Sequence, residues 1–414
     1  MQILAKKHWR ERGEDIHIMI LSQRIGFFSL AFGLLPNAWA GNWSGNVALE
    51  LRAFTEEGAS QQHSNYFSLA AQPEYYAKWD DGKQSFTFVP FVRVDQHDEE
   101  RSHADVRELT WLLAAQDYEW RIGVRKIFWG VTESQHLIDI VNQTDAVENP
   151  DGEEKLGQPM INLALIRAWG TLDLFMLPGF RERTFAGVEG RLRFALPVDT
   201  NQATYTSSQQ QRHIDYAVRW RKTLDAWDMG LSYFTGTSRD PRFTQGSATN
   251  GQVVLVPHYD LIKQTGFDVQ ATLGAWLWKL EAIHRSGQGQ SYNAATGGLE
   301  YTFVNVAESG VDVGMIGEYL YDERGTTAAT PFQNDAMIGS RFAFNDEQST
   351  ELLLGGIFDR DTNTRLYSLE ANRRIGAHWK VSVEARAYVA VAVTDPLYAL
   401  RNDDYFQIEA ARFF

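Results

Sequence analysis

The stretch Trp379–Val389 reads WKVSVEARAYV, and its side chains alternate between apolar residues and polar or charged ones. The apolar set is Trp379, Val381, Val383, Ala385, Ala387 and Val389, and the polar set includes Lys380, Ser382, Glu384 and Arg386. Successive side chains of a β-strand point to opposite faces, so the stretch predicts a strand with one apolar and one charged face. The segment 85–93 repeats the pattern. A soluble β-sandwich would bury the apolar face, whereas a transmembrane barrel would turn it to lipid.

Helical membrane spans are excluded by the distribution of apolar residues. Hydrophobic residues make up 44% of the chain, but they are spread out. After residue 40 no uninterrupted apolar run comes near the roughly 20 residues that a membrane-spanning helix needs. Any membrane span after residue 40 must therefore consist of strands.

The composition also limits the classes of function. The chain has no Cys, which removes disulfide frameworks and thiolate metal sites together. Its formal net charge of −14 argues against nucleic-acid binding, because a partner of that kind requires a basic surface. Acidic loops on a cell surface would account for the charge. No spacing of His residues indicates a metal site, and no phosphate-binding or dinucleotide motif is present, so we expect no cofactor.

The N-terminal segment predicts a secretory signal peptide. The apolar run 25–35 follows a positive charge and precedes small residues at Ala38 and Ala40, which predicts cleavage after residue 40. Residues 1–18 are polar and charged, unlike the start of a leader, which favours Met19 as the initiator. A buried amphipathic helix is the alternative interpretation of the run.

Residues 41–414 then predict one all-β domain, a transmembrane antiparallel up-and-down β-barrel of about 18 strands, with 16 as the alternative. The expected strands are 43–55, 65–78, 84–95, 104–115, 118–128, 160–168, 170–178, 212–222, 228–236, 258–272, 276–286, 292–304, 309–321, 335–344, 349–359, 364–374, 378–391 and 403–414. Short turns and long loops alternate between them, which supports an even strand number with both termini in the periplasm. The stretch 179–211 is the hardest to place, since 188–196 reads either as a further strand or as a folded-in loop segment.

The C-terminus carries a family resemblance. Phe406, Ile408, Ala410 and Phe414 alternate up to a terminal phenylalanine, and this pattern resembles the closing strand of Gram-negative outer-membrane porins. The resemblance implies a location in the outer membrane, recognition of Phe414 by the barrel-assembly machinery and, in many such proteins, a homo-oligomer. Arg412 departs from the pattern, because an aromatic or aliphatic residue is usual there, and we expect it to extend to the interface.

Charged residues on the inward face of the predicted strands suggest two walls of a pore. The basic wall consists of Arg121, Arg125, Arg219 and Arg221. The acidic wall consists of Glu318, Glu370 and Glu384. Opposed walls would create a transverse field that favours polar or zwitterionic solutes. The alternative is that these residues pair with neighbours and line a packed lumen.

The loop 129–158 is the third long loop, and in the porins that this chain resembles the third loop folds into the barrel. Its apolar segment contains His136, Leu137, Ile138, Asp139 and Ile140. We expect Leu137, Ile138 and Ile140 to pack on the inner wall, because apolar residues in a loop need cover. The acidic residues Asp145, Glu148 and Asp151 are a weak candidate Ca²⁺ site, with a solvated acidic loop as the alternative.

The next long loop, 179–211, is rich in arginine. Its arginines are Arg181, Arg183, Arg191 and Arg193. Guanidinium groups form bidentate hydrogen bonds with phosphates, so this loop would supply basic groups to the mouth of the pore or bind lipopolysaccharide.

The leading functional hypothesis is a porin for small polar or charged solutes. The first strand begins near Trp43, which leaves no room for the plug of an active transporter. A barrel that acts as a scaffold or sleeve for a partner protein is one alternative. A surface enzyme is another, but Ser134 and His136, two residues apart in a loop, are not a triad signal, and we expect no enzymatic activity.

Overall fold

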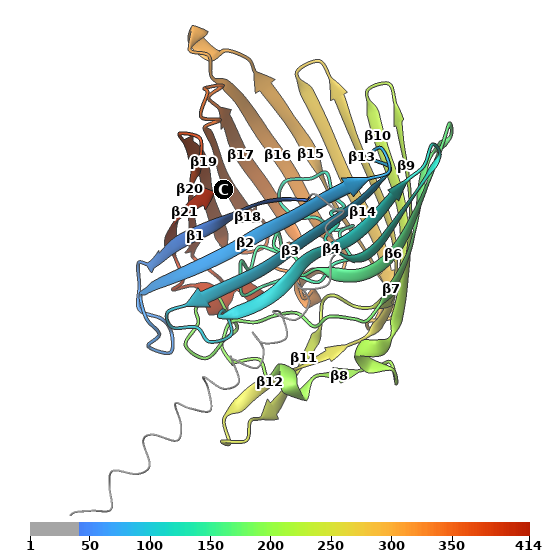
Figure 1. The fold of residues 1–414 in the computed structure, drawn as a ribbon. Coiled ribbons are helices and arrows are strands. Elements are labelled where there is room, and N and C mark those ends of the chain that lie inside the picture. Colours follow the sequence, from blue (N-terminus) through green and yellow to red (C-terminus); the bar gives the residue numbers. More distant parts are fainter. Residues whose placement is uncertain (1–40) are drawn as a thin grey trace, which may run out of the picture.

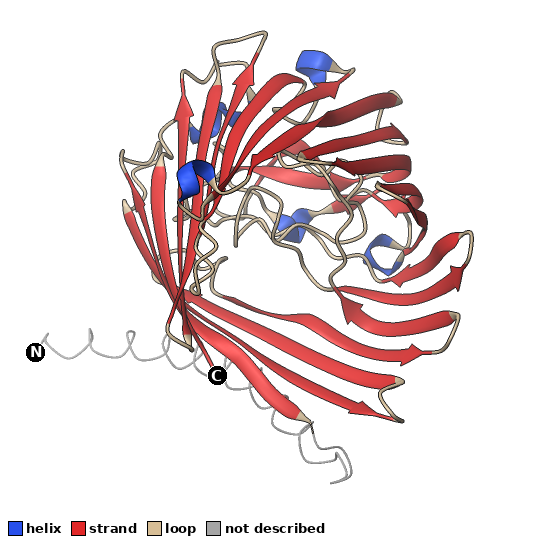
Figure 2. Cartoon of the chain, turned by 90° about the horizontal axis from the view of Figure 1, so that it is seen from above, coloured by secondary structure: helices blue, strands red, loops and turns tan. Residues whose placement is uncertain are grey.

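The computed structural model describes residues 41–414, and the predicted signal peptide lies outside the described residues. Eighteen antiparallel strands form one sheet that closes on itself, because β1 pairs with β2 on one side and with β21 on the other (Figures 1 and 2). The barrel strands are β1 (Asn42–Phe54), β2 (Asn65–Trp79), β3 (Gln84–Asp95), β4 (His103–Ala114), β5 (Tyr118–Arg125), β6 (Gln158–Arg167), β7 (Gly170–Pro178), β9 (Ile214–Leu224), β10 (Trp227–Thr237), β13 (Leu261–Leu273), β14 (Trp276–Ser286), β15 (Tyr292–Phe303), β16 (Asp312–Asp322), β17 (Asn334–Ala343), β18 (Glu351–Asp359), β19 (Arg365–Ile375), β20 (Trp379–Val389) and β21 (Tyr405–Phe413). The predicted fold class and the count of 18 are confirmed.

The remaining elements lie in the connections. They are β8 (Thr204–Tyr205), β11 (Arg242–Ser247), β12 (Val253–Tyr259) and the 3₁₀ turns η2 (Thr200–Gln202), η3 (Gln210–Arg212), η4 (Val306–Glu308), η5 (Gly325–Thr327) and η6 (Pro396–Leu400). The strands β8, β11 and β12 form a small separate sheet beyond one end of the barrel (Figure 1). Within residues 41–414 no helix is long and apolar enough to span a membrane.

The barrel is apolar outside and polar inside, the reverse of a water-soluble fold. On β1 the outward side chain of Leu49 is 57% exposed, whereas the neighbouring Glu50 is only 2% exposed. Val94 and Ile338 are likewise exposed on the outer face. A soluble sandwich would bury these apolar side chains, so the outer face requires an apolar surrounding such as lipid.

The small sheet corrects the predicted map at one place. We predicted a strand from residue 258, but the barrel strand β13 begins at Leu261, because residues 253–259 belong to β12. The segment 188–196 is not a strand, so the folded-in loop interpretation fits it. The hairpin of β11 and β12 lies inside a long connection and was not predicted, although Val254 and Val256 of β12 are buried and alternate with more exposed neighbours.

The alternation of short and long connections holds only in part. The two barrel ends differ, since the connections 126–157, 179–213 and 238–260 all leave the same end. At that end, however, the connections 287–291 and 360–364 are shorter than the opposite turns 304–311 and 344–350. β1 starts and β21 finishes at the end with the short turns.

A bulge between β3 and β4 matters for the interior. Val89 is opposite Glu108, but Pro90 is opposite Val106, so Arg107 is an extra residue on β4. A bulge redirects the side chain that it inserts. Arg107 is buried and points to the inside, where it contacts the third long loop.

Candidate functional site

The third long loop, residues 126–157, contacts the inner wall over much of the circumference. The view along the barrel shows loop segments within the ring of strands (Figure 2). Ile138 is fully buried in a cluster with Phe234 of β10 and Ile283 of β14. Trp129, Ile140 and Val141 belong to the same cluster, and Leu137 packs against it. This apolar contact holds the first half of the loop against β6 to β15.

Two carboxylates on the wall hold the backbone of the loop. Glu281 of β14 accepts hydrogen bonds from the N–H groups of Val131 and Thr132, at 2.7 and 3.1 Å. Glu318 of β16 accepts hydrogen bonds from the backbone N–H and the hydroxyl of Ser134, at 2.9 and 2.6 Å. Hydrogen bonds to ionised groups are about twice as strong as neutral ones, so these carboxylates fix the path of the loop.

The middle of the loop is bound by arginines from two parts of the wall. Arg107 contacts Asp145 at 2.6 Å, and Arg93 of β3 contacts Glu148 at 2.8 Å. Arg239, in the connection after β10, donates to the carbonyl of Val141 at 2.8 Å. The predicted basic and acidic walls did not include these arginines, because the bulge and the path of the loop cannot be read from strand alternation.

The Ca²⁺ candidate does not fit the geometry. His103, Asp145 and Glu148 each bring one potential ligand atom within 4.8 Å of the others, but Asp151 pairs with Arg386 instead. Arginine side chains already neutralise both Asp145 and Glu148. Burial alone would raise the pKa of Asp145, but its contacts with His103 and Arg107 outweigh burial and hold the pKa well below its usual range. A cation would have to displace a guanidinium group, so we do not propose a metal site here.

The loop reaches the wall again on either side of β18 and β19. On one side Glu133 pairs with Arg341 of β17 at 2.6 Å. On the other side Asp151 pairs with Arg386 of β20 at 2.7 Å, and Arg386 also contacts Glu384 at 2.8 Å. Across residues 41–414, no hydrogen bond or ion pair joins this loop to β18 or β19. β18 and β19 therefore have no polar contact with this loop, and the same is true of the described strands β2 and β21.

His136 lies in the third loop between Glu133 and Asp151, and its imidazole contacts two carboxylates. Its Nε2 is 2.9 Å from Glu153, and its Nδ1 is 3.7 Å from Glu281. Burial alone would lower the pKa of the His136 imidazole, but the two carboxylates outweigh burial and raise the pKa to about 10. His136 is therefore cationic at neutral pH, and it links the two ends of the loop to each other and to β14. Asp139 is buried as well, beside Lys155 at 3.1 Å.

The predicted basic wall is brought together, but three of its four arginines are paired with carboxylates. Arg121 and Arg221 both approach Asp173 of β7, at 3.7 and 3.6 Å. Arg219 pairs with Asp268 of β13 at 2.9 Å, and Arg125 lies 3.4 Å from the side chain of Asn162. Asp173 and Asp268 could have been predicted as partners of these arginines, since both occupy inward positions of predicted strands. These positions match the alternative in which wall charges pair with their neighbours.

The three predicted acidic residues have different surroundings. Glu318 holds the third loop and is buried. Glu384 contacts Arg386, Asn149 and Tyr405. Only the side chain of Glu370 remains half exposed, at 50%, although it lies 3.4 Å from Arg386.

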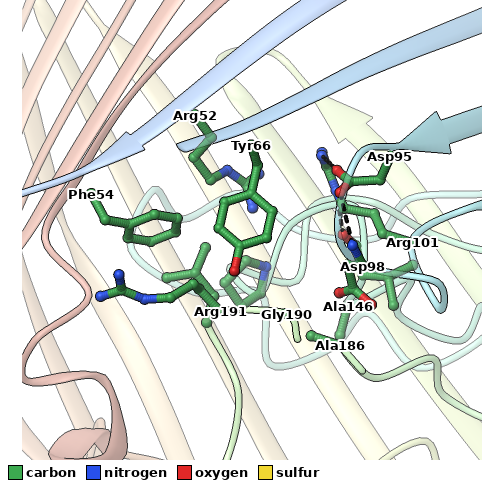
Figure 3. A pocket seen from close by; sticks show the side chains of 13 residues that line it. Arg52, Phe54, Tyr66, Asp95, Asp98, Arg101, Ala146, Ala186, Gly190 and Arg191 are labelled. Carbon is green, nitrogen blue, oxygen red and sulfur yellow. Dashed lines mark hydrogen bonds and ion pairs between the residues drawn. The ribbon is translucent and has the colours of Figure 1, made fainter. Parts of the chain in front are cut away.

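The fourth long loop, residues 179–213, packs at the mouth. Arg191 is buried, pairs with Asp403 at 2.6 Å and lies over the ring of Phe54 at 4.1 Å. The pocket beside it, lined by Tyr66 and Arg101 among others, has a cavity volume of about 20 Å³, which is room for one water molecule (Figure 3). It is therefore too small to bind a solute.

The other arginines of the fourth loop are also engaged. Arg181 pairs with Asp105 and Arg183 with Asp240, each at 2.8 Å. Arg193 donates to backbone carbonyls, including that of Gly190. Binding of lipopolysaccharide by these residues stays a prediction, and it would have to compete with these contacts.

Ser134 and His136 do not form a nucleophile–base pair. The hydroxyl of Ser134 donates to Glu318, and the imidazole of His136 contacts Glu153 and Glu281. A nucleophile needs a base within hydrogen-bond reach, so the enzymatic alternative gains no support from this pair.

No protein-family model matches the chain, and no curated protein matches it. Among solved structures it is similar to OmpT, an outer membrane protein of Vibrio cholerae in its trimer form, with 10% identity over 91% of this chain and 100% of that one and a TM-score of 0.47. It is also similar to a mutant of the Rh. blastica porin, with 12% identity over 90% of this chain and 100% of that one and a TM-score of 0.44. By the pairing of its own strands, this chain is a closed, 18-stranded antiparallel β-barrel.

Proposed function

We propose that the protein is an outer-membrane porin that lets small polar or charged solutes diffuse through a lumen narrowed by the third loop. The observation that carries the proposal is the asymmetric attachment of this loop. It is bonded to the wall at β14, β16, β17 and β20, yet not to β18 or β19. The remaining passage would run along the inner faces of these two strands.

The charges beside this passage favour a weakly cation-selective channel. The loop contributes Glu133, Asp151 and Glu153, and the wall contributes Glu370 and the cationic Arg341 and Arg386. Because the cationic His136 pairs with Glu153, the set holds four carboxylates and three cations. Side-chain rings of one sign raise the local concentration of ions of the opposite sign, so cations would pass more easily than anions.

The outward apolar face supports a location in the outer membrane. A closed barrel has no sheet edge and satisfies its backbone hydrogen bonds internally, as the hydrocarbon region requires. The C-terminal Phe414 is 60% exposed at the end with the short turns, where assembly factors would reach it.

Single-channel recording in planar lipid bilayers tests the proposal. We expect ohmic openings in KCl, and a reversal potential under a salt gradient with the sign of cation preference. A purified, folded barrel that inserts but carries no current would contradict the proposal. That result would favour the scaffold alternative, in which the third and fourth loops close the lumen, as the buried Arg191–Asp403 contact at the mouth would allow.

A further inference from the structure

We call the inner faces of β17, β18 and β19 the trough; of these three strands only β17 is bonded to the third loop, through Arg341 and Glu133. Strand register places Leu353 between Arg341 and Glu370, since Arg341 is opposite Leu353 and Leu353 is opposite Glu370. Neighbouring strands lie 4.7–4.9 Å apart, so the Cα atoms of Arg341 and Glu370 are about 10 Å apart. A cation and an anion thus face the same strip of wall from its two sides.

The floor of the trough is low and apolar. In the next row Gly339 is opposite Gly355, and Gly355 is opposite Ser368, so two of the three residues have no side chain. The row after that contains Met337, Ile357 and Leu366, all aliphatic or thioether side chains. Leu353 and Ile357 are only partly buried and pack beside the cluster of Ile316, Leu320 and Met337.

Both charged groups keep hydrogen-bonding capacity for a solute. The side chain of Arg341 is 40% exposed, and its contacts with Glu133 and Glu300 use Nη2 and Nε. Since a guanidinium group has five N–H donors, the donors on Nη1 remain for a ligand. The side chain of Glu370 is 50% exposed and contacts Arg386 through Oε1, which leaves Oε2 available to a ligand.

We propose that this trough binds small zwitterions with an aliphatic side chain, namely amino acids or short peptides. The solute carboxylate contacts Arg341, its ammonium group contacts Glu370, and its side chain lies on Leu353 and Ile357. The inference rests on the proposed function, because the solute reaches the trough through the lumen. It adds a chemical class to that function: a solute with both charges and an apolar body is preferred over one that lacks any of the three.

Four probes separate these features. Leucine carries both charges and the side chain, leucinamide lacks the carboxylate, N-acetylleucine lacks the ammonium group, and glycine lacks the side chain. Binding to the full-length mature barrel in detergent micelles is measured at pH 6 by saturation-transfer NMR, at equal probe concentrations. We expect leucine to bind about three- to fivefold more tightly than each of the others, as suits partly exposed ion pairs.

Two neutralising variants test the assignment of each charge. Arg341→Gln is expected to remove the preference for leucine over leucinamide and to keep the preference over N-acetylleucine. Glu370→Gln is expected to do the reverse. Arg374→Gln is the matched control, because Arg374 is an exposed arginine on the same strand as Glu370, four residues closer to the short turn. It should leave both preferences unchanged.

Folding and conduction are recorded on the same samples. Each variant is checked by the heat-dependent shift of the barrel in SDS gels, and the side chains changed are exposed, so the barrel should form. Equal binding of the four probes, or unchanged preferences in both neutralising variants, would overturn the trough while an observed KCl conductance left the porin standing. Selective leucine binding without any conductance would support the trough and contradict the channel.

Discussion

Two parts of the inner wall meet the third loop in opposite ways. Along β6 to β15 the inward apolar residues, such as Phe175 and Phe234, are buried beneath Ile138 and its neighbours. Along β18 and β19 the inward residues, such as Leu353 and Glu370, have no bond to this loop and stay partly exposed. The difference indicates that the loop is a fixed partition, attached by apolar packing on one side and by ion pairs at its free edge. Under the proposed function, the wall that the loop leaves open would determine which solutes pass.

The largest expected effect comes from removing the partition. Replacing residues 131–150 by a short Gly-Ser linker should raise the single-channel conductance severalfold, because the barrel is closed by strand pairing that excludes these residues. Removing the hairpin of β11 and β12 is the matched control, since it lies beyond the end of the barrel (Figure 1). An unchanged conductance after deletion of 131–150 would show that the loop does not narrow the passage.

The next largest effect concerns the apolar contact of the third loop with β6 to β15. Ile138→Ala removes buried methyl groups from the cluster with Phe234 and Ile283, which costs about 2–4 kcal/mol where a cavity remains. We expect faster amide hydrogen exchange in the third loop, with no change in the exchange of the barrel strands. Leu354→Ala, on the outward face of β18, is a control of similar size. Equal exchange in the wild type and in Ile138→Ala would contradict the apolar attachment.

A smaller effect should appear on the ion-paired edge, through His136. Its pKa is raised to about 10 from about 6.5 in an unfolded chain. The contact therefore stabilises the loop fully below about pH 6.5, and the stabilisation is lost as the pH rises through about 10. Open-channel current noise should increase between pH 8 and pH 11 in the wild type. In His136→Gln the noise should already be raised at pH 8 and should change less with pH.

The barrel could be predicted from the sequence because the alternation of apolar and polar side chains is a local property of each strand. Alternation along single stretches such as Trp379–Val389 sets the face of every residue, and the outward exposure of Leu49 beside the buried Glu50 confirms it. The apolar segment of the third loop was also readable, since Ile138 and Ile140 needed cover. Its attachment points were not, because Glu281 and Arg107 acquire their roles only through the path of the loop and a bulge that no periodicity reveals.

The basic wall illustrates the same limit and gives the smallest expected effect. From sequence, Arg121→Glu with Arg125→Glu should shift permeability toward cations, and the shift should appear in the reversal potential under a salt gradient. Arg121, however, is already paired with Glu119 and shares Asp173 with Arg221. Arg125 has only the side chain of Asn162 as a partner and therefore carries most of the expected shift, which should be about twofold. Glu370→Gln changes the net charge by one unit, whereas the double arginine variant changes it by four. Glu370 lies, however, on a part of the wall that the loop does not bond, so its replacement should shift the ratio toward anions by at least as much. A larger shift from the arginine pair would place the narrowest point on their side of the lumen and would reverse the comparison between the two walls.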